Sequence, residues 1–512
     1  MMVVEKARKY LEKNPYLIVI LYCAIASTIV WWIGLARLAP LLKLYNTPRL
    51  DISFLRSEGA PGLERIVASF IVLAGSYGLA YYWAGKAHGK LAWAVIIMGG
   101  LLQAGVLLYM APFTSTDIFD NISHGRILAL YHANPFQTVA ALFPHDPFTR
   151  FDGWPQAPSA YGPLWEDTAG LIARLAGNGI VQNVIAFKLL PGLLWTACAG
   201  VVGLILRKRS PSNALRGVLL LAWNPVALFE VWGNGHNDPA FLIFVLLAIW
   251  ALLERRYTLT ILSLTVGTLV KFMPAVLIPA AGLIALQQLP GWRVRLGYLL
   301  RTGLASLGLV VVAYAPFWRG LQTLSLNRRA HLFSNSLSSA IYFTLSKSIG
   351  AVRADHLIVP VAAALTVVFA LWMAYRAMRS TAPDRFAVAA MLTFAFYLLG
   401  TVLFFWPWYT LWLVALIPLV RDRQLRTLAI LFSFSAISRY FIVYPAFNWK
   451  PPLLQQPMLE IYQVAILFGI PWLYMVYALV ARRLKPAPQP QPAVQTFRIR
   501  PREVERKTRV PE

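Results

Sequence analysis

The chain has 512 residues, of which 58% are hydrophobic and 13% are charged, and its formal net charge is +26. A soluble domain usually carries about 25% charged residues, so this composition excludes an ordinary soluble protein and predicts many membrane crossings. The positive charge does not indicate nucleic-acid binding, because Lys and Arg collect in the cytoplasmic loops of membrane proteins.

Apolar runs long enough to cross a bilayer recur from the start of the chain to its end. The first is too long for the core of a signal peptide and further runs follow it, so we expect it to be a span. The sequence therefore predicts an all-α polytopic membrane protein, a bundle of about 13–14 transmembrane helices, at residues 16–36, 65–84, 90–111, 181–206, 213–230, 238–253, 257–271, 273–288, 297–317, 355–377, 386–404, 409–420, 427–443 and 460–480. The short pair within 257–288 is alternatively a re-entrant hairpin around Lys271.

The distribution of basic residues predicts the orientation of this bundle. If the N-terminus is cytoplasmic, 30 of the 47 basic residues fall in cytoplasmic segments, most of them short loops. This asymmetry favours cytoplasmic N- and C-termini. The membrane is expected to be a bacterial or archaeal plasma membrane. Residues 1–484 form the predicted transmembrane domain, and the long loop 112–180 lies on the extracytoplasmic side. Residues 485–512 are basic and rich in proline, which predicts a disordered cytoplasmic tail.

Several kinds of site are excluded by what the sequence lacks. Cys23 and Cys198 both lie in apolar runs and are expected to pack as small hydrophobic side chains. No P-loop, dinucleotide-binding glycine motif or zinc-protease motif occurs. We therefore predict no cofactor, no metal and no nucleotide-activated substrate, so a donor used outside the membrane should be preactivated and carried by a lipid.

The long loop 112–180 concentrates the scarce acidic residues, and loops of this length tend to be functional. It holds six of the 21 in the chain: Asp117, Asp120, Asp146, Asp152, Glu166 and Asp167. Thr116 is a predicted N-cap. The helix that follows places Asp117, Asn121 and His124 on one face, and its apolar face is expected to rest on the bilayer surface or on the spans.

Asp117 has two interpretations on local sequence alone. A carboxylate at a helix N-terminus is stabilised by the helix dipole, and such a group can accept a proton from a bound hydroxyl. The same carboxylate can equally serve only to cap its helix. The sequence leaves both roles open.

Two further polar clusters lie in predicted outer segments. Residues 154–170, with Tyr161, combine prolines and aromatic residues, which suits either sugar stacking or anchoring at the headgroup level. The turn Gly235-His236-Asn237-Asp238 follows a span. His236 and Asp238 can orient a polar ligand or pair with each other and with the backbone, but one His and one Asp make a poor metal site.

Lys271 is a cation within an otherwise apolar stretch, and such residues are functional candidates. It can neutralise a lipid phosphate near the outer interface, or its chain can extend to the interface from the end of a span. Other outer basic residues that can share the first role are Arg126, Arg328, Arg329, Arg353 and Arg439. Trp406, Trp408 and Tyr409 are expected in the aromatic belt at the membrane interface, with no chemical role.

Five motifs occur in one order between about residues 95 and 275. They are Asp117-Ile118-Phe119 leading to Gly125-Arg126 and Asn134-Pro135-Phe136; Tyr161-Gly162-Pro163-Leu164-Trp165; Trp223-Asn224-Pro225; Gly235-His236-Asn237-Asp238; and Lys271-Phe272 followed by Pro274. With these motifs the chain resembles the GT-C superfamily of membrane glycosyltransferases, and within it the polyprenyl-phosphate-mannose-dependent α-mannosyltransferases that build lipomannan-type glycans. His124 stands where members often carry an acidic residue.

The resemblance implies a polyprenyl-phosphate-sugar donor, a glycan or glycolipid acceptor, an extracytoplasmic site and inverting transfer that forms an α-glycosidic bond. It matches Asp117 to the catalytic aspartate. The predicted substrate-binding residues are Asp120, Asn121, His124, Arg126, Tyr161, His236, Asn237, Asp238, Lys271, Arg328 and Arg329. The alternatives are a transporter or flippase of a lipid-linked sugar, and a GT-C enzyme that uses a sugar other than mannose.

Overall fold

We analysed a computed structural model of the chain, which describes residues 14–47, 52–324, 331–454 and 458–484. The described residues form helices joined by loops, with two isolated β-bridges, Pro40–Met110 and Ser334–Phe404. The prediction of an all-α membrane protein is therefore confirmed. The predicted disordered tail lies outside the described residues.

The helices follow each other along the chain with few long connections. Their bounds are α2 Pro15–Val30, α3 Gly59–Ala84, α4 Lys90–Leu108, α5 Asp117–Ala129, α6 Pro163–Ala176, α7 Ile180–Arg209, α8 Pro211–Ala222, α9 Pro225–Ala227, α10 Pro239–Leu253, α11 Tyr257–Val270, α12 Ile278–Gln288, α13 Trp292–Tyr314, α14 Leu337–Ile349, α15 Ala351–Arg379, α16 Arg385–Phe396, α17 Leu411–Val414, α18 Arg423–Asn448 and α19 Met458–Leu484.

Each of the 14 predicted spans corresponds to a helical segment. Within the described residues, nine of these segments are long and apolar enough to cross a membrane: Pro15–Ala36, Leu55–Ala84, Lys90–Leu108, Ile180–Arg209, Pro211–Gly233, Trp292–Phe317, Ala351–Arg379, Arg423–Ala446 and Met458–Ala481. The other five are shorter apolar helices: Pro239–Leu253, Tyr257–Val270, Met273–Gln288, Arg385–Thr401 and Pro407–Leu419. The predicted positions were right, but the five short helices fall below the length of a full crossing.

Hydrogen bonds from buried indole groups tie the spans to one another. Trp31 Nε1 donates to Gln103 Oε1 at 3.1 Å, Trp223 Nε1 to Ile96 O at 2.7 Å and Trp195 Nε1 to Leu221 O at 3.0 Å. Such bonds between spans matter because lipid offers no alternative partner. Both cysteines are buried and free, as predicted.

A buried lysine on α7 fixes the end of α4, where the long loop begins. The ammonium of Lys188 donates to the carbonyl oxygens of Leu107 and Met110. The last carbonyls of a helix have no partner within it, so a buried donor here satisfies oxygens that would otherwise be unpaired. The contact anchors the start of segment 112–180.

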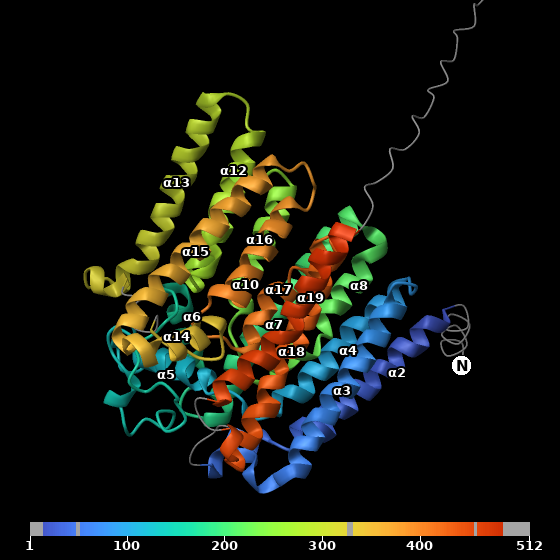
Figure 1. Ribbon diagram of the computed structural model, residues 1–512, viewed down its shortest axis with the longest axis vertical. Coiled ribbons are helices and arrows are strands. Elements are labelled where there is room, and N and C mark those ends of the chain that lie inside the picture. The colour runs from blue at the N-terminus through green and yellow to red at the C-terminus, as the bar shows by residue number, and fades with distance from the viewer. Residues whose placement is uncertain (1–13, 48–51, 325–330, 455–457, 485–512) are drawn as a thin grey trace, which may run out of the picture.

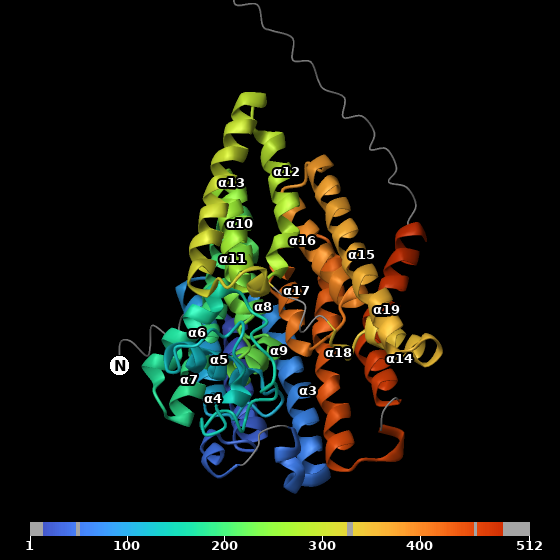
Figure 2. The same cartoon turned by 90° about the vertical axis from the view of Figure 1, so that its left-hand side faces the viewer.

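The long loop and the connections between spans define two ends of the bundle. Figure 1 shows α5 and α6, which come from the loop 112–180, below the lower end of α13, whereas the turn between α12 and α13 lies at the top. Figure 2 shows the same order after a quarter turn. The candidate site described next lies at the end with α5 and α6.

Helices α11 and α12 form a hairpin that reaches this end. α11 ends at Val270, Lys271 has extended backbone, and the 3-10 helix η6 (Met273–Leu277) leads into α12. Tyr257 at the start of α11 and Gln287 near the end of α12 line the same cavity at the opposite end. Lys271 therefore lies at the turn of a hairpin of two short helices.

Candidate functional site

Asp117 is the first residue of α5 and is partly exposed. Its carboxylate accepts a hydrogen bond from Trp154 Nε1 at 3.3 Å, and its own N–H donates to Ser115 Oγ at 3.2 Å. Thr116 occupies the N-cap position, as predicted, but its side chain makes no capping hydrogen bond. The role expected of Thr116 is taken by Ser115. Asp117 therefore also contacts a distant part of the same loop, 37 positions further along the chain.

Helix α5 is enclosed by protein. Ten consecutive residues, from Ile118 to Ile127, are buried, and Phe119 stacks on Phe151 with ring centroids 4.9 Å apart. A Cβ atom on Gly125 would meet Ala169 O at 2.4 Å, so glycine permits α5 and α6 to touch. The apolar face of α5 was expected to lie on the bilayer surface or on the spans. The first alternative is wrong, because the other loop residues and the spans cover α5.

Asn121 links three segments of the site. Its side-chain oxygen accepts from Trp165 Nε1 of α6 and, at 3.5 Å, from Asn237 Nδ2. Its amide nitrogen donates to Asp117 O at 2.7 Å. One side chain thus holds α5, α6 and the turn before α10 together, and it brings the two candidates Asn121 and Asn237 side by side.

Asp120, His124 and Asp152 form a buried group of ionisable residues. His124 Nδ1 is 3.8 Å from Asp120 Oδ1, and His124 Nε2 lies 3.3 Å from Ala157 O. Burial raises the pKa of Asp152 to about 6, and the charge of Asp120 raises it further, whereas His124 opposes the rise. The site therefore holds, besides Asp117, a buried carboxyl group with a pKa of about 6.

Arg126 lies on another side of α5. It follows Asp117 by nine residues, which places it about 13 Å further along the axis and on roughly the opposite face. Its guanidinium donates to Asp146 Oδ2 at 2.8 Å, Gly177 O at 2.9 Å and Asn178 Oδ1 at 3.1 Å. The structure therefore does not bring Arg126 together with the other candidates, and its contacts hold the loop.

The Tyr161-Gly162-Pro163 motif joins the long loop to the end of α11. Gly162 N donates to Val270 O at 2.9 Å, and a Cβ atom on Gly162 would lie 2.0 Å from Leu269 O. Pro163 then begins α6 with its fixed φ. Glycine is required here because the two backbones touch, and the contact places Tyr161 beside Lys271, whose Nζ is 5.7 Å from the ring centroid.

Tyr161 also reports where the acidic residues meet. Burial raises the pKa of its phenol well above the usual value, and the charges of Asp117, Asp120 and Asp238 raise it further. These three carboxylates come from α5 and from the turn before α10. The contact between Asn121 and Asn237 joins these two segments.

Lys271 points into the protein toward Asp238. Its Nζ is 2.9 Å from Asp238 Oδ1, which also accepts from Trp412 Nε1 at 2.6 Å. The ammonium lies 5.0 Å from the ring centroid of Tyr409 and 5.6 Å from that of Trp412. The Lys271 side chain keeps 16% exposure and that of Asp238 1%. Extension to the interface is thus excluded, and the cation is held at the site by a carboxylate and aromatic rings.

His236 belongs to a neighbouring buried network. Its ring stacks on Trp408 with centroids 3.6 Å apart, and its Nε2 lies 3.4 Å from Glu230 Oε2. Glu230 comes from the π-helical turn η5 (Leu228–Gly233) and also accepts from Tyr440 Oη at 2.8 Å. His236 and Asp238 therefore bind different partners and not each other.

Sequence reasoning missed the contribution of the segment 406–412. Trp406, Trp408 and Tyr409 were expected in the membrane belt, yet Trp408 stacks on His236 and Tyr409 on the Lys271 cation. The guanidinium of Arg439 lies 3.6 Å from the Trp406 ring centroid, and it interacts electrostatically with Glu230 and Asp117. The available signal was the density of aromatic residues after a span. Arg328 and Arg329 lie outside the described residues.

Comparison with known proteins finds a family that matches part of the chain. Residues 60–287 match a family described as alpha-(1->6)-mannopyranosyltransferase, N-terminal domain. This match confirms the predicted resemblance to membrane mannosyltransferases. The matched residues include Asp117, Tyr161, Asp238 and Lys271, so most of the site lies within the matched part.

Two curated relatives come from Corynebacterium glutamicum. Alpha-(1->6)-mannopyranosyltransferase B is 23% identical over 195 residues, which are 37% of this chain and 32% of the relative. Alpha-(1->6)-mannopyranosyltransferase A is 21% identical over 187 residues, 36% of this chain and 38% of the relative. The chain thus matches about a third of the length of these relatives. No solved structure matches it.

Proposed function

We propose that the protein transfers mannose from a polyprenyl-phosphate donor to a hydroxyl of a glycan or glycolipid on the extracytoplasmic side of the membrane, with inversion at the anomeric carbon. The observation that carries the proposal is that Asp117, Asp238 and Lys271, which is ion-paired with Asp238, all lie around Tyr161. All four residues belong to the part of the chain that matches the mannosyltransferase family. The names of the relatives make an α-(1→6) linkage the first product to test.

The proposed chemistry needs one base and one cation. Asp117 takes the proton of the acceptor hydroxyl while that oxygen attacks the anomeric carbon. The bond from this carbon to the phosphate oxygen breaks, and the polyprenyl phosphate leaves with the electron pair. A β-linked donor gives an α-linked product. Asp117 suits the role of base because it is partly exposed at the start of α5, where the helix dipole favours its ionised form.

Lys271 is the proposed partner of the departing phosphate. A cation fixed before the reaction stabilises developing negative charge without reorganisation, and the contact with Asp238 holds Lys271 in place at 2.9 Å. Arg439, whose guanidinium lies on the ring of Trp406, is the second cation proposed to stabilise the departing phosphate. His236, Asn237 and Tyr161 are proposed to orient the hydroxyls of the sugar or acceptor.

The test is a transfer assay in detergent with radiolabelled polyprenyl-phosphate-mannose, a panel of mannoside acceptors and a chelator. We expect wild-type protein to form a labelled α-mannoside and Asp117→Asn to lose a factor of about 10²–10⁴ in rate. Asp167→Asn is the matched control, because Asp167 is an exposed carboxylate of the same loop and should keep full activity.

The other outcomes separate the alternatives. Equal transfer by wild type and Asp117→Asn would move the base to Asp120 or Asp238. Loss of transfer with chelator would contradict the metal-free mechanism. If wild type forms no product with mannosyl donors, donors with other sugars test the choice of sugar. Movement of the labelled lipid across vesicles without any new product would instead establish a flippase.

A further inference from the structure

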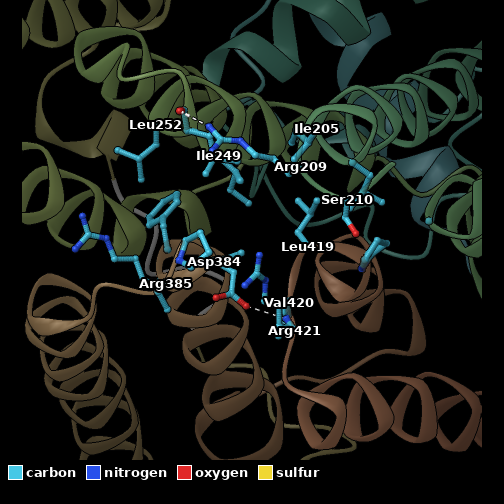
Figure 3. A pocket seen from close by; sticks show the side chains of 18 of the residues that line it. Ile205, Arg209, Ser210, Ile249, Leu252, Asp384, Arg385, Leu419, Val420 and Arg421 are labelled. Carbon is cyan, nitrogen blue, oxygen red and sulfur yellow. Dashed lines mark hydrogen bonds between the residues drawn. The ribbon is translucent and has the colours of Figure 1, made fainter. Parts of the chain in front are cut away.

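A cavity of about 920 Å³ lies at the end of the bundle opposite the candidate site. It is bounded by the last turn of α7, the end of α10, the start of α16 and the segment that joins α17 to α18, as Figure 3 shows for Arg209, Leu252, Arg385 and Val420. Since α11 runs from this cavity to Lys271 and has 14 residues, the two sites are about 20 Å apart along the helix.

The cavity has a basic wall and an apolar floor. Among the described residues that line it, Asp384 is the one acidic residue. Its basic lining consists of Lys208 and six arginines: Arg209, Arg216, Arg255, Arg385, Arg421 and Arg426. Lys208 is paired with Glu254 at 2.6 Å. The side chain of Asp384 accepts from Arg421 N at 2.8 Å. Ile205, Ile249 and Leu419 form part of the floor (Figure 3).

Within the described part of the chain, two of these arginines, Arg216 and Arg426, have a donor without a partner, and Arg216 is also held in place. The guanidinium of Arg216 lies 4.3 Å from the Tyr81 ring centroid, and its Cδ passes so close to Gly85 that a Cβ there would meet it at 2.8 Å. Among the described residues, Nε of Arg216 and Nε of Arg426 are buried without a hydrogen-bond partner. A buried donor without a partner costs free energy, so a ligand that accepts these bonds stabilises the protein.

The usual excess of positive charge in cytoplasmic loops does not account for this arrangement. That rule concerns the loops and requires only that the charges stay on one side of the membrane. It predicts solvated side chains, such as the exposed Arg293 and Arg376. Here arginines from α7, α8, α16 and α18 line one cavity, where like charges repel each other. An anion in the cavity would remove both the repulsion and the unmet donors.

We infer that this cavity binds a phosphate group. Several planar guanidinium groups around one volume suit a phosphate, whose oxygens accept paired hydrogen bonds from arginine. The apolar floor fits the chain of a lipid, and the basic wall fits either a lipid headgroup or free phosphate. The site is separate from the proposed transfer chemistry, because none of its residues belongs to the candidate site.

The experiment measures binding to the purified full-length chain. Inorganic phosphate is titrated in neutral detergent, and phosphatidic acid is titrated in nanodiscs of phosphatidylcholine. We expect wild-type protein to bind at least one of the two with a rise in apparent Tm. Arg216→Gln with Arg426→Gln should weaken that binding by about tenfold per lost charge-assisted bond. Arg293→Gln with Arg376→Gln is the matched control, because each lies on a tryptophan ring outside the cavity.

Asn213→Glu supplies an independent variant. Asn213 lines the cavity and is exposed, so the change adds a negative charge without disturbing the core and should also weaken binding. Binding of phosphate identifies free phosphate as the ligand, and binding of phosphatidic acid alone identifies a lipid headgroup. Absence of both from wild type, or equal binding by wild type, the arginine double variant and Asn213→Glu, would overturn the inference.

Discussion

At the end of the bundle that holds Asp117, the Lys271 ammonium lies 2.9 Å from a carboxylate and among aromatic rings. At the opposite end, six arginines line one cavity with a single acidic residue among its described lining, and Nε atoms of Arg216 and Arg426 remain unpaired. The first arrangement fixes one cation where charge is proposed to develop. The second leaves positive charge unbalanced, as a binding site for an anion requires. Five predictions test this contrast.

The largest expected effect is on the rate of transfer, at the end of the bundle that holds Asp117 and Lys271. Lys271→Gln should lower kcat by about 10²–10³, the usual loss when one fixed donor to a developing charge is removed. Lys271→Arg keeps the charge and should retain part of the rate. The measurement is transfer at saturating donor, together with apparent Tm. A Lys271→Gln variant that folds and keeps its full rate would remove Lys271 from the mechanism.

The second prediction compares one acidic residue from each end. Asp238→Asn should lower the free energy of unfolding by about 3 kcal/mol, because it leaves the Lys271 cation without its counter-ion. Asp384→Asn at the arginine cavity should cost less than about 1 kcal/mol, since an amide oxygen can still accept from Arg421 N. Thermal unfolding in detergent measures both changes, and equal losses would contradict the contrast between the ends.

A double variant sharpens this result. Asp238→Asn combined with Lys271→Met removes both charges of the pair and should recover part of the lost stability. It should not recover transfer. Recovery of activity together with stability would mean that the pair acts only as a structural element.

The third prediction concerns the backbone contact that brings Tyr161 to Lys271. Gly162→Ala should cost about 2 kcal/mol of stability and lower activity, because its Cβ atom would overlap Leu269 O at 2.0 Å. Gly75→Ala is the matched control, since nothing lies within 4 Å of a Cβ atom there. Equal apparent Tm and activity for the two variants would show that the contact at Gly162 does not hold the site.

The sequence was sufficient for the fold class and for the positions of the 14 predicted spans, and it singled out Asp117 and Lys271 as candidate site residues. Those residues were visible because an ionisable group in or beside an apolar run is rare. Trp412 and Tyr440 were not visible, because an aromatic residue in a span looks the same whether it faces lipid, core or site. Their roles depend on contacts with Asp238 and Glu230, 174 and 210 positions away along the chain.

The sequence left the burial of α5 open for a related reason. Its apolar face suits the bilayer surface as well as it suits a protein interior, and only the arrangement of α6, α7 and the loop residues decides between them. Likewise, the basic residues of the predicted cytoplasmic loops were counted for topology, whereas their convergence on one cavity depends on the packing of several helices.

The fourth prediction uses the pH dependence of Asp152, which interacts with Asp120 and His124. Burial raises the pKa of Asp152 from 3.8 to about 6. The folded protein therefore binds more protons than the unfolded chain between these values, and its stability should fall by about 1–3 kcal/mol as pH rises from 4 to 6. Asp152→Asn should remove this slope in apparent Tm. Asp120→Asn should move it to lower pH, because the charge of Asp120 raises the pKa of Asp152.

The smallest effect is expected from salt, and it distinguishes the two ends directly. Raising NaCl from about 0.1 M to about 1 M shortens the Debye length from about 10 Å to about 3 Å, which weakens repulsion among the cavity arginines but hardly affects the buried pair of Asp238 and Lys271. Apparent Tm should rise by an amount equivalent to about 0.5 kcal/mol. Arg216→Gln with Arg426→Gln should reduce this dependence, and Lys271→Met with Asp238→Asn should not. A dependence that disappears instead in the Lys271 double variant would mean that the unbalanced charge lies at the Asp117 end, and the contrast between the two ends would be reversed.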